Sequence, residues 1–334
     1  MIWLTWRQFR TQATVVFAAV AALASVLAVT GPQLADLHET AGSSLADRLS
    51  GSDQTVYYVG LTVVLAVPAV IGMFWGAPLI SRELETGTHR LVWNQSITRA
   101  RWLAAKLGLG ALATMTAAGL ASLVVTWWSG PIDRAVNSGG GSGTYLARLD
   151  PMAFVARGVV PIGYAAFAFV LGVTLGVLIR RTLPAMATTL AVYVAVQLVM
   201  PLWGRPHLAA PDQTTVAFTA GTPVGIDEGA MEVTVPLDVP GAWLTSEQTL
   251  DAAGHPAAPP TSFADCLHTE SGLASLRQVD RCVAGLGELG YQQQVTYQPA
   301  GNFWALQWAE TGIYLGLALG LAGFCAWWIR RRLT

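Results

Sequence analysis

Charged side chains are scarce in this chain. They make up 12% of its 334 residues, whereas 53% are hydrophobic and the mean hydropathy is +0.47. A soluble domain carries about 25% charged residues. The low charge, combined with repeated long apolar runs, excludes an ordinary soluble protein and predicts an all-α, polytopic membrane protein.

Metal ligands and nucleotide-binding motifs are also few. The five His and three Cys are scattered, and we therefore expect no metal site and interpret His207, His255 and His268 as surface residues. No GxxxxGK[ST] phosphate loop is present, which excludes nucleotide hydrolysis by that route. No nucleophile–base–orienter set is visible, so we expect no catalytic residue, no cofactor held by this chain and no enzyme activity of its own.

Six apolar runs approach the roughly 20 residues that cross a bilayer. They cover residues 13–30, 56–80, 102–128, 152–179, 183–203 and 304–329. Arg180 and Arg181 divide the fourth run from the fifth and predict a tight helical hairpin. The positive-inside rule then predicts that both termini are cytoplasmic. With this orientation the inside segments hold most of the basic residues, namely Arg7, Arg10, Arg82, Arg90, Arg99, Arg101, Lys106, Arg180, Arg181, Arg330, Arg331 and Arg332.

The largest external segment, 204–303, lies between spans five and six and predicts a small mixed domain. Alternating runs such as AMEVTVPLDV indicate strands, and residues 262–290 have helical spacing. Shorter external loops are expected at 31–55, with one or two helical turns around residues 34–49, and at 129–151. Aromatic residues near the return to the bilayer predict an interfacial belt formed by Tyr297, Phe303, Trp304 and Trp308.

Cys266 and Cys282 both fall in this external segment. An oxidising exterior permits a disulfide, which would contribute about 3 kcal/mol by closing such a loop. The alternative is two unpaired small residues. Cys325 lies in the last span, and we predict that it is a buried packing residue.

Glycines at four-residue spacing recur within the spans and allow close approach of helices. They predict packing inside the bundle or, alternatively, a face for a second copy. The three sets are Gly72 and Gly76, Gly172 and Gly176, and Gly312, Gly316 and Gly320.

Two other polar features lie at or within spans. Gln307 and Glu310 in the last run are candidate cavity or gate residues, although a position solvated at the interface is the simpler interpretation. Residues 1–12 predict an amphipathic helix in the inner headgroup plane, or merely the start of span one. Its aromatic and basic side chains are Trp3, Trp6, Arg7 and Arg10.

Residues 81–106 form a charged insert between two apolar runs. It carries Glu83 and Glu85, the only acids expected inside, and five basic residues. Such a segment cannot lie in hydrocarbon, so we predict a functional loop over 81–101 at the membrane surface.

This insert resembles a motif of the permease subunit of ABC-2-type ABC transporters. The resemblance rests on an acidic pair, a Gly-Thr, an apolar and aromatic stretch, a Ser-x-x-Arg and a lysine that opens the next span. These are Glu83, Glu85, Gly87, Thr88, Leu91 to Trp93, Ser96 to Arg99, and Lys106. The resemblance implies four parts: a connecting helix at 1–12, spans one to five within 13–203, an extracellular region at 204–303, and the last span with a basic tail at 304–334.

In that family the loop between spans two and three is a coupling helix that docks on an ATPase. The resemblance therefore implies two ABC ATPase subunits carrying ATP and Mg, a second permease that is identical or related, a bacterial plasma membrane, and no nucleic acid. It implies export of an amphipathic drug, lipid or peptide. An alternative is a membrane receptor or assembly module whose external domain binds a ligand or protein. The implied coupling residues are Glu83, Glu85, Gly87, Thr88, Arg90, Trp93 and Gln95.

Overall fold

The structure is a computed structural model of the chain, and it divides into two compact units. One unit comprises Met1–Leu208 with Gly301–Thr334, and the other comprises Ala209–Ala300. The residues that the structure describes are 2–87, 99–139, 145–222, 224–227, 232–234, 239–269, 272–273 and 275–332.

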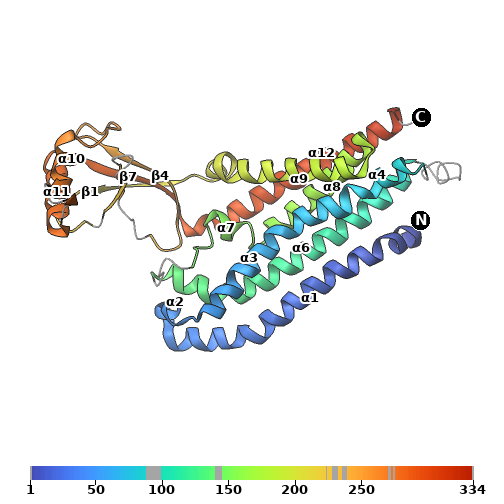
Figure 1. The fold of residues 1–334 in the computed structure, drawn as a ribbon, viewed down its shortest axis with the longest axis horizontal. Coiled ribbons are helices and arrows are strands. Elements are labelled where there is room, and N and C mark those ends of the chain that lie inside the picture. The colour runs from blue at the N-terminus through green and yellow to red at the C-terminus, as the bar shows by residue number, and fades with distance from the viewer. Residues whose placement is uncertain are drawn as a thin grey trace. The chain divides into compact units, whose positions relative to one another are not determined.

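The first unit is a helical bundle (Figure 1). Within the described residues, six helical segments are long and apolar enough to cross a membrane, which confirms the predicted number of spans. They are built from α1 (Ile2–Ala41), α3 (Gly51–Ile71) continued by η2 (Gly72–Gly76) and α4 (Pro78–Glu85), α6 (Arg99–Asn137), α8 (Val160–Ile179), α9 (Thr182–Val199) continued by η3 (Met200–Gly204) and η4 (Arg205–His207), and α12 (Phe303–Arg332).

Several helices extend well beyond their apolar runs. α1 continues without a break from Ile2 to Ala41, so residues expected as a connecting helix, a span and a loop form one helix. The segment 31–55 is thus more helical than the loop with one or two helical turns that was expected: only the short η1 (Gly42–Ser44) and α2 (Leu45–Arg48) separate α1 from α3. α3 begins with a capping box in which Ser50 and Asp53 satisfy each other's backbone N–H groups.

The expected fourth span is also divided. A short helix, α7 (Pro151–Phe154), precedes α8, and a turn separates the two. α8 lies at the centre of the bundle, because nearly all of its side chains are buried. A helix that is apolar all round is suited to this central position.

Glycines allow η2 to pack directly against α8. A Cβ on Gly76 would lie 2.4 Å from the Phe169 carbonyl oxygen, and one on Gly172 would lie 2.3 Å from that of Gly72. These contacts show packing within the bundle for the first two glycine sets. The third set differs, because a Cβ on Gly312, Gly316 or Gly320 would meet no atom within 4 Å.

One end of the bundle gathers the two termini and α4 (Figure 1). A buried apolar cluster joins Ala13 near the start of α1, Ile80 of α4, Trp102 of α6 and Ile329 near the end of α12. Segments far apart in the sequence therefore share this end, which we call the α4 end.

The second unit is a mixed α/β fold. β1 (Asp212–Ala217), β7 (Gln292–Gln298) and β4 (Trp243–Leu250) form an antiparallel sheet in the order β1-β7-β4. Two ribbons pair β2 (Gly225–Asp227) with β3 (Glu232–Thr234) and β5 (His268–Thr269) with β6 (Gly272–Leu273). The helices are α10 (Thr261–Leu267) and α11 (Leu276–Glu288), and the turn η5 (Ala300–Asn302) follows β7. Its core contains Phe218, Phe263, Leu267, Cys282, Val283 and Leu286.

One expectation for this region needs correction. Residues 262–290 are not one helical stretch, because the β5–β6 ribbon separates α10 from α11. Of the aromatic residues expected near the return to the bilayer, Tyr297 belongs to β7, where it pairs with Asp212. Trp304 and Trp308 do lie exposed on α12, whereas Phe303 is buried.

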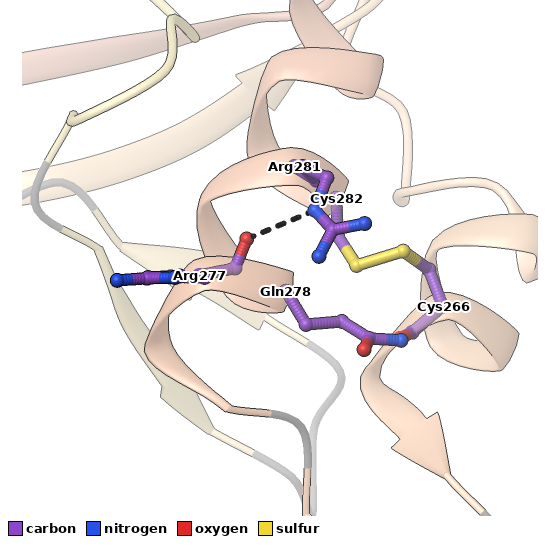
Figure 2. The surroundings of a disulfide bond; sticks show 5 residues. All are labelled: Cys266, Arg277, Gln278, Arg281 and Cys282. Carbon is purple, nitrogen blue, oxygen red and sulfur yellow. Dashed lines mark hydrogen bonds between the residues drawn. A yellow bond between two sulfur atoms is a disulfide. The ribbon is translucent and has the colours of Figure 1, made fainter.

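A disulfide joins α10 to α11 through Cys266 and Cys282, whose Cα atoms lie 5.9 Å apart (Figure 2). The Gln278 side-chain amide also donates to the Cys266 carbonyl at 3.2 Å. Along one continuous helix the two cysteines would lie about 24 Å apart, too far for a bridge. The break between the helices is therefore what permits the bond.

Loss of this disulfide is expected to destabilise the second unit by about 3 kcal/mol, because the open chain regains loop entropy. The variant is Cys282→Ser, and the measurement is hydrogen exchange of residues 209–300 in the full chain under non-reducing conditions. Cys325→Ser is the control, since Cys325 is a free buried thiol in the bundle. Equal protection of residues 209–300 in both variants would contradict the assignment.

Candidate functional site

The candidate site is at the α4 end, where the acidic pair of the charged insert lies. Glu83 and Glu85 occupy the last turn of α4. Gly87 follows with φ +74°, a left-handed conformation that glycine adopts without strain. The other expected coupling residues, Thr88, Arg90, Trp93 and Gln95, lie outside the described residues.

Glu83 forms an ion pair with Lys106 near the start of α6. The Glu83 carboxylate lies 2.5 Å from Lys106 Nζ, which also donates to the Leu79 carbonyl at 3.3 Å. Lys106 is the only lysine of the chain, is 3% exposed and lies 4.8 Å from the Trp102 ring centre. Because α4 precedes residues 88–98 and α6 follows them, this pair joins the two flanks of that segment.

Glu85 binds a different helix. Its carboxylate oxygen Oε2 accepts from the backbone N–H of Thr182 at 3.1 Å and from the Thr182 hydroxyl at 2.7 Å. Thr182 is the first residue of α9, where backbone N–H groups lack partners within the helix and attract anions. The Ser81 hydroxyl, 3.2 Å from Thr182 Oγ1, adds a second contact between α4 and α9.

The turn between α8 and α9 places Thr182 within reach of α4. Arg180 ends α8 in a left-handed conformation with φ 58°, so the chain reverses within two residues. α8 itself approaches α4 closely, since a Cβ on Gly176 would lie 2.5 Å from the Ala77 carbonyl oxygen. The predicted hairpin at Arg180 and Arg181 is confirmed, and it brings the turn between α8 and α9 to the α4 end.

A second polar cluster is buried inside the bundle. Glu310 and Arg205 form an ion pair in which Glu310 Oε2 lies 2.9 Å from Arg205 Nε, and both side chains are 0% exposed. The Tyr164 hydroxyl donates to Glu310, and the Arg205 guanidinium lies 4.1 Å from the Phe154 ring centre. Full burial excludes the solvated interfacial position considered for Glu310.

Gln307, one turn before Glu310, holds the start of α8. Its side-chain oxygen accepts from the backbone N–H groups of Val159 and Val160, each at 2.9 Å, and its amide donates to the Phe154 carbonyl at 3.1 Å. A Cβ on Gly158 would lie 2.7 Å from that same oxygen. Gln307 is therefore a structural capping residue in this conformation.

Sequence reasoning did not identify Arg205, Arg157 or Thr182 as partners. Arg157 is 1% exposed and pairs with Asp133 of α6. The available signal was a basic residue near the start of the apolar run 152–179 for Arg157, and one just after the run 183–203 for Arg205. The expected connecting-helix side chains of Trp3, Trp6 and Arg7 lie outside the described set, and Arg10 is exposed.

An apolar groove runs between α6 and the start of α8. Its volume is about 500 Å³, and Trp304 of α12 also lines it. The backbone N–H of Gly158 donates to the Thr126 hydroxyl at 3.1 Å, so this polar pair at the groove is satisfied internally. Among the described residues, no charged side chain lines the groove, whose other lining residues are Met115, Thr116, Gly119, Leu120, Leu123, Val159 and Ile162.

Within the described part of the chain, no group of three or more His, Cys, Asp and Glu residues is arranged to hold a metal ion. In the second unit, the exposed His255 lies 4.0 Å from Asp251. The backbone N–H of His255 donates to Asp251 and lowers the pKa of that carboxyl group. The pair is thus a local turn contact.

Comparisons with known proteins identify the family. A family model described as ABC-2 membrane transporter related matches residues 17–205. No curated protein and no solved structure matches the chain. The match covers more than half of the 334 residues, including α4 and all or most of five of the six apolar helical segments. The chain therefore belongs to the ABC-2 membrane transporter related family, as a multi-pass transporter permease of a kind that works with an ABC ATPase.

Proposed function

We propose that this chain is the membrane-spanning subunit of an ATP-driven exporter, and that a separate ABC ATPase docks on residues 88–98. The observation that carries the proposal is the Glu83–Lys106 pair, which joins the two helices flanking that segment. A docked partner can thus act on two helices, α4 and α6, that are held together by this pair. ATP and Mg are bound by the partner, because this chain has no phosphate loop.

The orientation follows from charge. Among the described residues, the segments at the α4 end carry 11 of the 19 basic residues of the chain, namely those at 7, 10, 82, 99, 101, 106, 180, 181 and 330–332. The positive-inside rule therefore assigns this end, with both termini, to the cytoplasmic face of a bacterial plasma membrane. Residues 204–303 are then extracellular, where the Cys266–Cys282 disulfide is chemically stable.

The cargo is an amphipathic drug, lipid or peptide. The groove between α6 and α8 supports this, since its volume of about 500 Å³ and its uncharged lining suit an apolar ligand portion. Transport requires a second permease, which we take to be an identical copy served by a second ATPase subunit. The exposed face around Gly312, Gly316 and Gly320 on α12 is available to such a copy.

Co-purification with a co-expressed ABC ATPase tests the proposal. Replacing residues 88–98 with a Gly/Ser linker of equal length should abolish ATPase binding, because the docking surface is removed. Deleting residues 210–295 should leave ATPase binding intact.

The same pair of variants addresses the alternative of a receptor or assembly module, which the compact second unit favours. That alternative predicts that the deletion abolishes function, whereas the linker has no effect. Retention of the ATPase by the linker variant would contradict docking at residues 88–98.

A further inference from the structure

The acidic pair of α4 faces helices of its own chain. We propose that Glu83 and Glu85 are positioning residues that transmit motion of the docked segment to α6 and α9 separately, and that neither is a docking residue for the ATPase. This inference rests on the proposed function. It assigns ATPase binding to residues 88–98 and the transmission of motion to Glu83 and Glu85.

Glu83 connects α4 to α6. Its partner Lys106 is almost fully buried, and the 2.5 Å ion pair is supported by the Leu79 carbonyl and the Trp102 ring. A charged lysine in such a position depends on its counter-ion, because an unpaired buried charge is costly. Displacement of α4 must therefore carry the start of α6 with it or break the pair.

Glu85 connects α4 to α9. It accepts both the backbone N–H and the hydroxyl of Thr182, so one carboxylate oxygen holds the first residue of that helix. α9 also packs along α8 and η2, and α4 contacts it directly. Glu85 therefore fixes the first residue of α9 to the last turn of α4, so that displacement of this turn must move the start of α9 or break these hydrogen bonds.

The two connections diverge from one rigid element. α4 packs on α8, where Gly176 approaches Ala77 directly before α4, and two acids of its last turn bind two other helices. Residues 88–98 begin three residues after Glu85. Motion of this segment is thus transmitted by α4 in two ways, through Glu83 to α6 and through Glu85 to α9.

The test compares Glu83→Gln, Glu85→Gln and the control Glu39→Gln in the full chain bound to its ATPase. Glu39 is an exposed carboxylate on α1 and lies outside the site. Each complex is measured for ATPase stoichiometry and for hydrogen exchange of the first turns of α6 and α9, in ADP and in ATP. Labelling of Lys106 by an amine-reactive reagent, read from the peptide that contains it by mass spectrometry, is a second measurement, and side-chain amine labelling of this chain reports on Lys106 alone because it is the only lysine.

All three variants should bind the ATPase as the unsubstituted chain does. Glu83→Gln should lose the nucleotide-dependent change at α6 and keep that at α9, and its Lys106 should label several-fold faster. Glu85→Gln should show the reverse pattern of exchange. The charge exchange Glu83→Lys with Lys106→Glu should restore the response at α6.

Loss of ATPase binding in Glu83→Gln or Glu85→Gln would overturn the inference and make these residues part of the docking surface. Unchanged responses at both helices would overturn it as well. Failure of the unsubstituted chain to bind any ABC ATPase is a different result, because it would contradict the proposed function itself.

Discussion

Replacing Glu310 with glutamine is expected to destabilise the bundle by about 3–5 kcal/mol, because it removes the carboxylate that pairs with the buried Arg205 charge. Both side chains are 0% exposed, so water cannot replace the lost carboxylate. The pair also joins η4, which leads into the second unit, to α12, which follows that unit. The effect should appear as a large fall in the thermal unfolding temperature of the purified chain.

A double substitution separates the lost ion pair from a general packing defect. Arg205→Met combined with Glu310→Leu removes both charges and should recover most of the stability, since an apolar pair avoids the desolvation of two ions. Arg277→Gln, at an exposed arginine on α11, is the control for removal of a surface charge. If Glu310→Gln unfolds at the temperature of the unsubstituted chain, the buried pair is wrongly assigned.

Gly172→Val is expected to prevent accumulation of the folded bundle. A Cβ at this position would lie 2.3 Å from the Gly72 carbonyl oxygen and 2.7 Å from the Ala77 backbone nitrogen. Both are backbone atoms, so η2 must move away from α8, and the cost should exceed the roughly 3 kcal/mol typical of overpacking. Size-exclusion chromatography of the detergent extract gives the folded fraction.

Gly316→Val is the matched control, because a Cβ at Gly316 meets no atom within 4 Å. It adds the same side chain to the same residue type in another span. The monomer should therefore remain folded, and a change in oligomeric mass would identify this face of α12 as the contact with a second copy. Equal folded yields for Gly172→Val and Gly316→Val would contradict the close packing of η2 on α8.

The spans were predictable from sequence because an apolar run of sufficient length has few alternatives to crossing the bilayer. Their ends were not predictable from hydropathy. Polar residues 33–41 continue α1, since hydropathy reports the hydrocarbon boundary and not the end of the helix. The same holds for residues 129–137 of α6, which were expected in a loop.

The second unit was less predictable for a similar reason. β7 has the sequence QQQVTYQ, which lacks an apolar alternation, yet it is the central strand between β1 and β4. Its pairing partners lie far away in sequence, so local patterns did not reveal it. The division between α10 and α11 was missed because their apolar spacing continues on both sides of the β5–β6 ribbon.

Only part of the candidate site could be predicted from the sequence. Glu83, Glu85 and Lys106 stood out as charges between apolar runs, and the structure shows what each acid binds. Thr182 carried no signal, because it lies 97 residues from Glu85 and is a common residue at a helix start. Arg205 was assigned to the outside because it lies at the margin of an apolar run.

Site-specific photo-crosslinking tests the central claim most directly. A photoreactive amino acid is placed at Trp93 in one variant and at Trp304, on α12, in another, and each chain is co-expressed with the ABC ATPase. The account predicts a crosslink to the ATPase from position 93 and none from position 304. A complex that forms without a crosslink from position 93, or that crosslinks from position 304, would contradict it.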